Sequence, residues 1–246
     1  MFSFLKNHPF AVEAFFENSY VLTFAVPKES VEHIIPECLQ LDTLEDKWTF
    51  IAVAMVQTKG LRPKNFPSFM GNDFFLIGYR IFVRYTNNAG KKLRGLYILK
   101  SETDKKKMEW LGNIFTHYNY ITTDITETRS ENIIAFESAK SGLKVELGTE
   151  REGVLLPKSS PFKDWKEARR FAGPLPFTFT YDAATQTVLI IEGVRENWTP
   201  SPLKVIDYKF SFLDSLHIHE MELANAFVIG DIPYYWKKGK KEQWKV

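Results

Sequence analysis

A single lysine at the end of a predicted aliphatic strand is the residue best suited to do chemistry. Lys100 follows Tyr97, Ile98 and Leu99 within the stretch Arg94–Tyr120. A lysine that forms a Schiff base needs a neutral amine, and burial in an apolar pocket or a nearby cation lowers the lysine pKa toward neutrality. Such an imine would act as an electron sink in a lyase or decarboxylase reaction on a small keto acid.

The acidic residues after Lys100 support a second interpretation. Glu102 and Asp104 are close enough in sequence to pair with the amine, and such a pair keeps a lysine protonated. A lysine at a strand end also extends readily to solvent along its aliphatic stem. Lys100 is therefore either an imine-forming residue or part of a structural ion pair. If residues 94–101 and 117–125 form neighbouring strands, Lys100 and Glu102 belong to the polar rim of a pocket.

Arg80 stands in the middle of the apolar run Phe74–Tyr85, which predicts a strand. An arginine in this position must be paired or must face a wet cavity, because burying an unpaired charge is costly. Its planar guanidinium group suits the carboxylate of a substrate. An ion pair with a strand glutamate such as Glu137, or exposure on the outer face of the sheet, explains the residue equally well.

Three further candidates for substrate binding, His117, Tyr118 and Tyr120, open the next predicted strand. Successive strand residues point to opposite faces, so His117 and Asn119 would share one face and the two tyrosines the other. An inward histidine and asparagine could transfer protons, whereas inward tyrosines would form an apolar wall rimmed by hydroxyl groups. Ordinary packing of aromatic side chains in a sheet is the competing interpretation.

The histidines and the cysteine do not predict a metal or cofactor site. His217 and His219 would share a strand face, but the third position on that face is Met221, a poor zinc ligand. The single cysteine, Cys38, excludes an internal disulfide and is expected to be a buried, inert thiol. The sequence contains no glycine-rich phosphate-binding motif. We expect neither a cofactor nor a metal.

The composition favours a globular β protein. Aromatic residues make up 15% of the chain, with 21 Phe, and such residues favour strands and can line an apolar cavity. The net charge of +2 gives no overall field that would attract nucleic acid. No apolar run is long enough to span a membrane and the N-terminus does not resemble a signal peptide, so we expect a cytoplasmic protein without membrane association. Whether the chain forms a homo-oligomer is left open.

Apolar periodicity predicts a chain made mostly of strands, with about three short helices. The expected strands are 13–26, 48–58, 74–85, 92–101, 117–126, 132–139, 143–149, 177–181, 187–193, 205–212, 217–223 and 226–229. The expected helices are 27–36, 104–115 and 160–171, the second capped by Thr103 or Asp104 and the third beginning at Ser160-Pro161.

No linker divides the chain, so residues 1–246 are expected to form one domain, and closure into a barrel would remove exposed sheet edges. Residues 1–10 resemble a loose lead-in. Residues 234–246 form a basic and aromatic tail that could touch an anionic surface or serve as an interaction module, although a solvated terminus is the commoner case.

Several short motifs form a recognisable series along the chain. Between Val26 and Pro63 they are a Val-Pro, a short helix ending in Ile-Pro, a Leu-x-Leu-Asp-Thr turn, an aromatic strand and a Gly-x-Arg-Pro loop. Later motifs are Tyr79–Val83, Arg94–Ile98, Glu192–Leu203 and Tyr208. Together they resemble the uncharacterised YqjF-like family, and this resemblance implies membership of the acetoacetate decarboxylase-like superfamily.

This resemblance implies a mainly β (α+β) fold, an open, conical antiparallel β-barrel with a central and largely apolar cavity. The decarboxylase motif Gly-Tyr-Pro-Lys is absent, so no catalytic role passes to Lys100 by motif. Leu76 and Gly78 stand where the YqjF-like pattern usually has Glu and Asn. The leading functional hypothesis is a barrel that binds a small, partly apolar organic molecule. The alternatives are a Schiff-base lyase at Lys100 and an interaction module that uses the basic tail.

Overall fold

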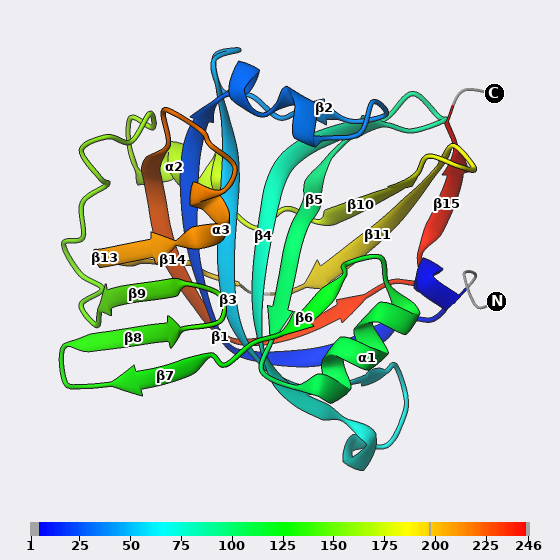
Figure 1. Ribbon diagram of the computed structural model, residues 1–246, viewed down its shortest axis with the longest axis horizontal. Coiled ribbons are helices and arrows are strands. Elements are labelled where there is room, and N and C mark those ends of the chain that lie inside the picture. The colour runs from blue at the N-terminus through cyan, green and yellow to red at the C-terminus, as the bar shows by residue number, and fades with distance from the viewer. Residues whose placement is uncertain (1–4, 197, 245–246) are drawn as a thin grey trace.

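The computed structural model describes residues 5–196 and 198–244, and long strands dominate it (Figure 1). In this part of the chain the main sheet has eleven strands and a second sheet has four. The main sheet contains β1 (Val12–Pro27), β2 (Gln40–Leu41), β3 (Trp48–Pro63), β4 (Asn72–Thr86), β5 (Lys92–Thr103), β6 (Tyr120–Thr122), β10 (Phe177–Asp182), β11 (Thr187–Arg195), β12 (Ser201–Pro202), β14 (Glu222–Trp236) and β15 (Lys240–Gln243). The second sheet contains β7 (Thr126–Arg129), β8 (Ile133–Ser138), β9 (Leu143–Gly148) and β13 (Val205–Phe210).

Three α-helices accompany these strands in the described residues: α1 (Lys106–Phe115), α2 (Trp165–Ala172) and α3 (Ser211–Asp214). The predicted mainly β architecture with about three short helices is therefore confirmed.

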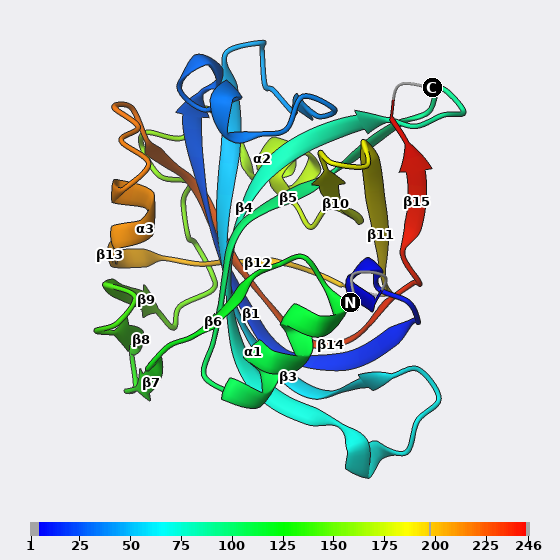
Figure 2. The same cartoon turned by 45° about the vertical axis from the view of Figure 1, so that its right-hand side comes forward.

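The main sheet curls until its strands surround an interior (Figure 2). Its order runs from β14 through β1, β3, β4, β5 and β10 to β11, and β11 pairs again with β14. The closure is uneven, because β5 pairs with β10, in parallel, only through Gly95–Tyr97. The result is an open barrel, as predicted, in which not every strand pair is antiparallel.

The central strands β1, β3 and β4 are buried on both faces. Residues 49–56 of β3 are all buried, as is typical of a strand whose residues form a near-continuous apolar run. On the outer face of the barrel, Tyr20 meets Phe136 of the second sheet with ring centroids 5.2 Å apart. On the inner face, Phe50 stacks on Phe162, with ring centroids 5.0 Å apart, beside α2. Burial of apolar surface on both sides of one sheet is the main source of stability here.

Two helices cover the inner space at different places. Ala168 and Ala172 of α2 pack against Phe50 and Phe82 at one end of the barrel. Met108 of α1 packs with residues of β3, β4 and β6. Figures 1 and 2 both show α1 in front of the barrel, beside β6 and near the N-terminal segment.

The helices differ from the predicted ones in their extent or in the residue that caps them. Residues 27–36 form two 3-10 turns, Lys28–Ser30 and Glu32–Ile34, rather than one helix. Asp104 does not cap α1, since its carboxylate accepts a hydrogen bond from the Phe75 amide on β4 at 2.7 Å. For α2, the cap is Asp164 rather than Ser160, and it accepts from the Glu167 amide at 2.7 Å.

Two predicted strands are wrong in part because the backbone turns into the left-handed region. Asn119 has φ 50°, so residues 117–119 form a turn and only Tyr120–Thr122 continue as β6. His217 has φ 52° and follows α3, so the predicted strand 217–223 begins only at Glu222. A residue in this region departs from the extended backbone of a regular strand.

The basic and aromatic tail is part of the barrel wall as far as the structure describes it. Tyr234–Trp236 end β14 and pair with β11, and Lys240–Gln243 form β15, which pairs with the same strand. Lys237 binds Glu192 at 2.9 Å and Lys240 binds Glu242 at 2.7 Å. The expected solvated tail is therefore replaced by paired strands.

A buried aspartate joins the ends of three elements. Asp42, whose side chain is 0% exposed, lies beside β2 in the Leu-x-Leu-Asp-Thr turn. Its carboxylate accepts from Arg84 of β4 at 2.5 Å and from Arg94 of β5 at 2.6 Å. Arg94 also donates to the Phe171 carbonyl at 3.0 Å, which links this cluster to α2.

We expect Asp42→Asn to lower the free energy of unfolding by about 2 to 3 kcal/mol, because it leaves two arginines without their shared carboxylate. Urea denaturation at neutral pH measures the change. The matched control is Asp46→Asn, since Asp46 pairs with Lys28 while its side chain is 84% exposed. The control should change stability by less than about 0.5 kcal/mol. Equal effects of the two substitutions would contradict the assignment.

Candidate functional site

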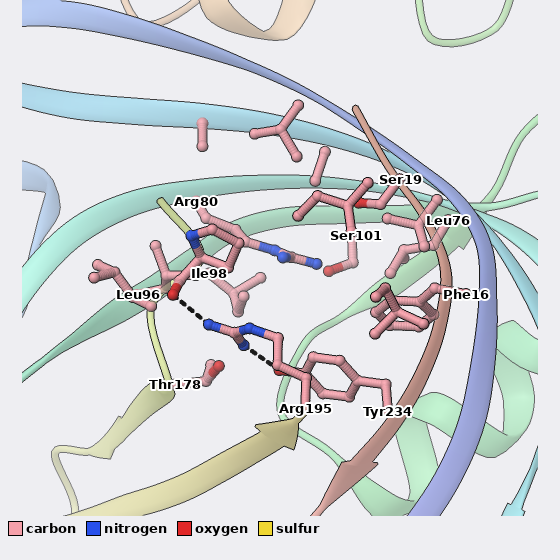
Figure 3. Close-up of a pocket in the computed structure, with 18 of the residues that line it drawn as sticks. Phe16, Ser19, Leu76, Arg80, Leu96, Ile98, Ser101, Thr178, Arg195 and Tyr234 are labelled. Atoms are coloured by element: carbon pink, nitrogen blue, oxygen red, sulfur yellow. Dashed lines mark hydrogen bonds between the residues drawn. The ribbon is translucent and has the colours of Figure 1, made fainter. Parts of the chain in front are cut away.

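The interior of the barrel contains a cavity of about 140 Å³ that is lined by all the long inner strands. Most of its wall is apolar, with side chains such as Val21, Ala54, Leu96 and Phe227. The polar groups that line it are Ser19, Arg80, Ser101, Tyr118, Tyr120, Thr178, Arg195, Tyr234 and Trp236. Figure 3 shows Arg80 and Arg195 extending into this space from different sides.

Arg80 enters the cavity from β4, and its guanidinium group lies across the glycine two residues earlier. A Cβ atom at Gly78 would come within 2.9 Å of the Arg80 Nε and Nη2 atoms. Residues two apart on a strand share a face, so only glycine at position 78 lets the side chain lie along the strand. The Nε atom is buried without a hydrogen-bond partner, and no ion pair with Arg80 forms among the described residues. The predicted alternative partner, Glu137, is on β8 of the second sheet instead.

Arg195 ends β11 and lines the same cavity (Figure 3). It donates hydrogen bonds to the Pro174 carbonyl and to the Tyr234 hydroxyl, the latter at 3.3 Å. Its guanidinium carbon lies 5.4 Å from the centre of the Trp198 ring. The Nε atom is buried without a partner. These contacts fix the direction of the side chain but leave part of its hydrogen-bonding capacity unused.

Tyr118 and Tyr120 both line the cavity, although Tyr118 lies in the turn before β6 and only Tyr120 belongs to that strand. Burial raises the pKa of both hydroxyl groups, and for Tyr120 to about 12, even though the positive charge of Arg80 acts in the opposite direction. Both tyrosines are therefore neutral hydrogen-bond donors near neutral pH. In the described chain no Asp, Glu, His or Lys lines this cavity. It combines two cations with neutral polar groups.

Lys100 lies on the outer face of the barrel, away from this cavity. In the pairing of β4 with β5, Tyr79 is opposite Lys100 while Arg80 is opposite Ile98, so Leu99 is an extra residue, a β-bulge. Ile98 and Ser101 line the cavity, whereas Lys100 lies 5.2 Å from the centre of the Phe212 ring on the outer side. Without the bulge, alternation from Ile98 would have turned Lys100 inward.

Glu102 is next to Lys100 in space as well as in sequence. Its carboxylate lies 2.8 Å from the Lys100 amine, and its side chain is 4% exposed while that of Lys100 is 22% exposed. The Ser141 hydroxyl donates to the same oxygen at 2.8 Å and continues into a chain of hydroxyl groups through Thr123 and Ser138. This arrangement matches the structural ion pair that was one of the two predictions for Lys100.

The remaining candidates lie apart from the arginines. His117 lines a separate cavity of about 230 Å³ together with Asn119, and burial is the main cause that lowers its pKa. His217 and His219 lie in the turn after α3. The described residues contain no group of three or more His, Cys, Asp or Glu side chains that could hold a metal ion.

None of the helices described is both long and apolar enough to cross a membrane.

A comparison with protein-family models decides the family. The model of DUF2071, described as an uncharacterized conserved protein, matches residues 14–230. The chain belongs to this family. A search of curated proteins finds no match.

Solved structures show which fold the DUF2071 chain shares. The acetoacetate decarboxylase of Legionella pneumophila matches with a TM-score of 0.61 at 10% identity, covering 95% of this chain and 88% of that one. An acetoacetate decarboxylase-like enzyme from Sphingomonas wittichii matches with a TM-score of 0.60 at 11% identity, covering 97% and 94%. The enduracididine biosynthesis enzyme MppR complexed with pyruvate matches with a TM-score of 0.56 at 8% identity, covering 95% and 90%. At such identities the likeness establishes the acetoacetate decarboxylase-like fold alone.

Arg195 was missed in the sequence because nothing local distinguishes it from a charged residue at the end of a strand. The two arginines face one cavity only because the main sheet curls and brings β4 and β11 to different sides of the same interior. Two weak signals existed: Gly78 two residues before Arg80, and Trp198 three residues after Arg195.

For the DUF2071 chain without ligand, we expect Arg80→Met to raise the free energy of unfolding by about 1 kcal/mol, because it removes an unpaired, partly buried charge while keeping the side-chain volume. The matched control on the same strand is Arg84→Met, which should destabilise the protein because Arg84 pairs with Asp42. Urea denaturation in a buffer free of carboxylate and phosphate measures both. Destabilisation by both substitutions would show that Arg80 has a structural partner.

Proposed function

We propose that this protein binds a small organic anion, foremost a carboxylate, in the barrel cavity. The observation that carries this proposal is the pair of arginines, Arg80 and Arg195, which face one cavity with buried Nε atoms that lack partners. No acidic side chain of the described residues lines that cavity. A guanidinium group forms strong, charge-assisted hydrogen bonds to carboxylates, so an anionic ligand would satisfy both groups.

The rest of the wall supports binding of a small and partly apolar molecule. The cavity of about 140 Å³ is close in size to an engineered cavity of about 150 Å³ that admits benzene. Neutral hydroxyl groups of Tyr118, Tyr120 and Ser101 can add hydrogen bonds to the bound anion. Pyruvate, the compound named with the structurally similar MppR, is a small carboxylate of this kind.

The cavity itself does not favour catalysis. A Schiff-base reaction needs an amine, and a proton transfer at neutral pH needs a base whose pKa lies near 7. The lining offers neither a lysine nor a histidine or carboxylate in the described chain, and the tyrosine hydroxyl groups hold their protons. We therefore propose binding as the function of this cavity.

Isothermal titration calorimetry tests the proposal with pyruvate and butanoate as probes and butanamide as the neutral counterpart of butanoate. Both acids should bind, and the amide should bind at least about tenfold more weakly because it lacks the charge. Arg80→Gln and Arg195→Gln should each weaken binding of the acids by about tenfold or more, since each removes a charged hydrogen bond.

The matched control is Lys92→Gln, which removes an exposed positive charge from β5, the hairpin partner of β4. It should leave the affinity unchanged. The proposal fails if butanamide binds as well as butanoate, or if the two arginine variants bind the acids as the unmodified protein does.

The alternative hypothesis, a Schiff-base lyase at Lys100, has its own test. Treatment with pyruvate and borohydride followed by peptide mass analysis should label Lys100 no more than exposed lysines such as Lys92, because Lys100 pairs with Glu102 outside the cavity. Preferential labelling of Lys100 would contradict our placement of the ligand and would favour the lyase.

A further inference from the structure

An apolar groove lies beside the barrel cavity, between α1, the segment that precedes β1 and the connection from β3 to β4. Its volume is about 520 Å³. The side chains that define it are Phe10, Leu61, Phe66, Met70, Leu111 and Phe115. Figure 2 shows α1 and the connection from β3 to β4 on the same side of the barrel, below its centre.

The groove and the cavity share part of their walls. Phe16, Leu76, Tyr118, Tyr120 and Trp236 line both spaces. These five side chains form a partition, with the two arginines on one side and the apolar groove on the other. The cavity that contains the two arginines therefore adjoins the groove across these shared side chains.

The groove differs from the cavity in chemistry. Its exposed apolar side chains include Phe66, at 47%, and Met70, at 45%. Contiguous exposed apolar surface on a folded protein commonly marks a binding site. Burial lowers the pKa of His8, which also lines the groove, to about 4, so this imidazole adds no charge at neutral pH. Arg62 at the rim is paired with Glu13 at 2.6 Å.

We propose that the ligand is an amphipathic monocarboxylate, such as an unbranched alkanoate of medium length. Its carboxylate binds Arg80 and Arg195, and its hydrocarbon chain passes the partition beside Tyr118 and Trp236 into the groove. This inference rests on the proposed function and extends it, because it assigns the groove to the apolar part of the same ligand. The shared walls favour this occupant over a separate partner, which would not need the arginines.

Titration of butanoate, hexanoate, octanoate and decanoate, each below its micelle concentration, tests the inference. Burial of one methylene contributes about 0.8 kcal/mol, which corresponds to an affinity gain of roughly fourfold per carbon when the chain is fully buried. We expect a gain of about two- to fourfold per carbon for the longer acids. With Arg80→Gln, all four acids should weaken by the same factor, because the carboxylate site is common to them.

Two phenylalanines of one loop provide matched variants. Phe66 lines the groove, whereas Phe69 is 85% exposed and does not line it. We expect Phe66→Ser to weaken decanoate binding by about five- to tenfold and to leave butanoate binding unchanged. Phe69→Ser should change neither. Both side chains are at the surface, so neither substitution should prevent folding.

The outcomes separate the two proposals. If butanoate binds in an Arg80-dependent way but affinity does not rise with chain length, the assignment of the groove is wrong and the proposed function stands. If no acid binds, the proposed function fails, and the groove assignment fails with it. If Arg80→Gln does not weaken decanoate binding, the carboxylate does not bind at the arginines and the inference is overturned. Equal effects of Phe66→Ser and Phe69→Ser on decanoate binding would also overturn it.

Discussion

The central strands of this protein are apolar on both faces, and this constraint organises the rest of the fold. A sheet with one apolar face needs a single cover, but β1, β3 and β4 need two. The second sheet covers the outer face, with Tyr20 and Phe136 in contact across the interface. On the inner face the main sheet curls around itself, and α2 fills one end of the interior. The barrel and its cavity are thus consequences of double-sided burial.

A single extra residue decides which charged group faces which side of the barrel wall. Leu99 forms a bulge in β5, and beyond it every side chain changes face relative to simple alternation. Lys100 consequently turns to the outer side, where it pairs with Glu102, whose carboxylate also accepts a hydrogen bond from the Ser141 hydroxyl. Ser101 turns inward instead. The bulge therefore places the ion pair of Lys100 and Glu102 on the side of the sheet opposite the barrel cavity.

The cavity contrasts with the other charged clusters of the protein. Asp42 satisfies both Arg84 and Arg94, and this cluster stabilises the junction of β2, β4 and β5. Arg80 and Arg195 have no such carboxylate in the described chain, although both are held in place, Arg80 over Gly78 and Arg195 by Pro174 and Tyr234. Positioned charge without a partner lowers the stability of the empty protein and is typical of a binding site. A ligand carboxylate would supply the missing partner.

The sequence by itself determined the strand-rich class and the approximate positions of the long strands, because apolar patterning acts locally. It also identified Arg80 as a charge that needs an explanation. Only the tertiary structure decided that Tyr118 and Tyr120 line one cavity, that Arg195 joins Arg80, and that Lys100 faces away. The reason is physical. These placements depend on the left-handed conformation of Asn119, the bulge at Leu99 and the pairing of β11 with β14. All three result from the packing of the whole barrel, which the local preferences of the residues do not determine.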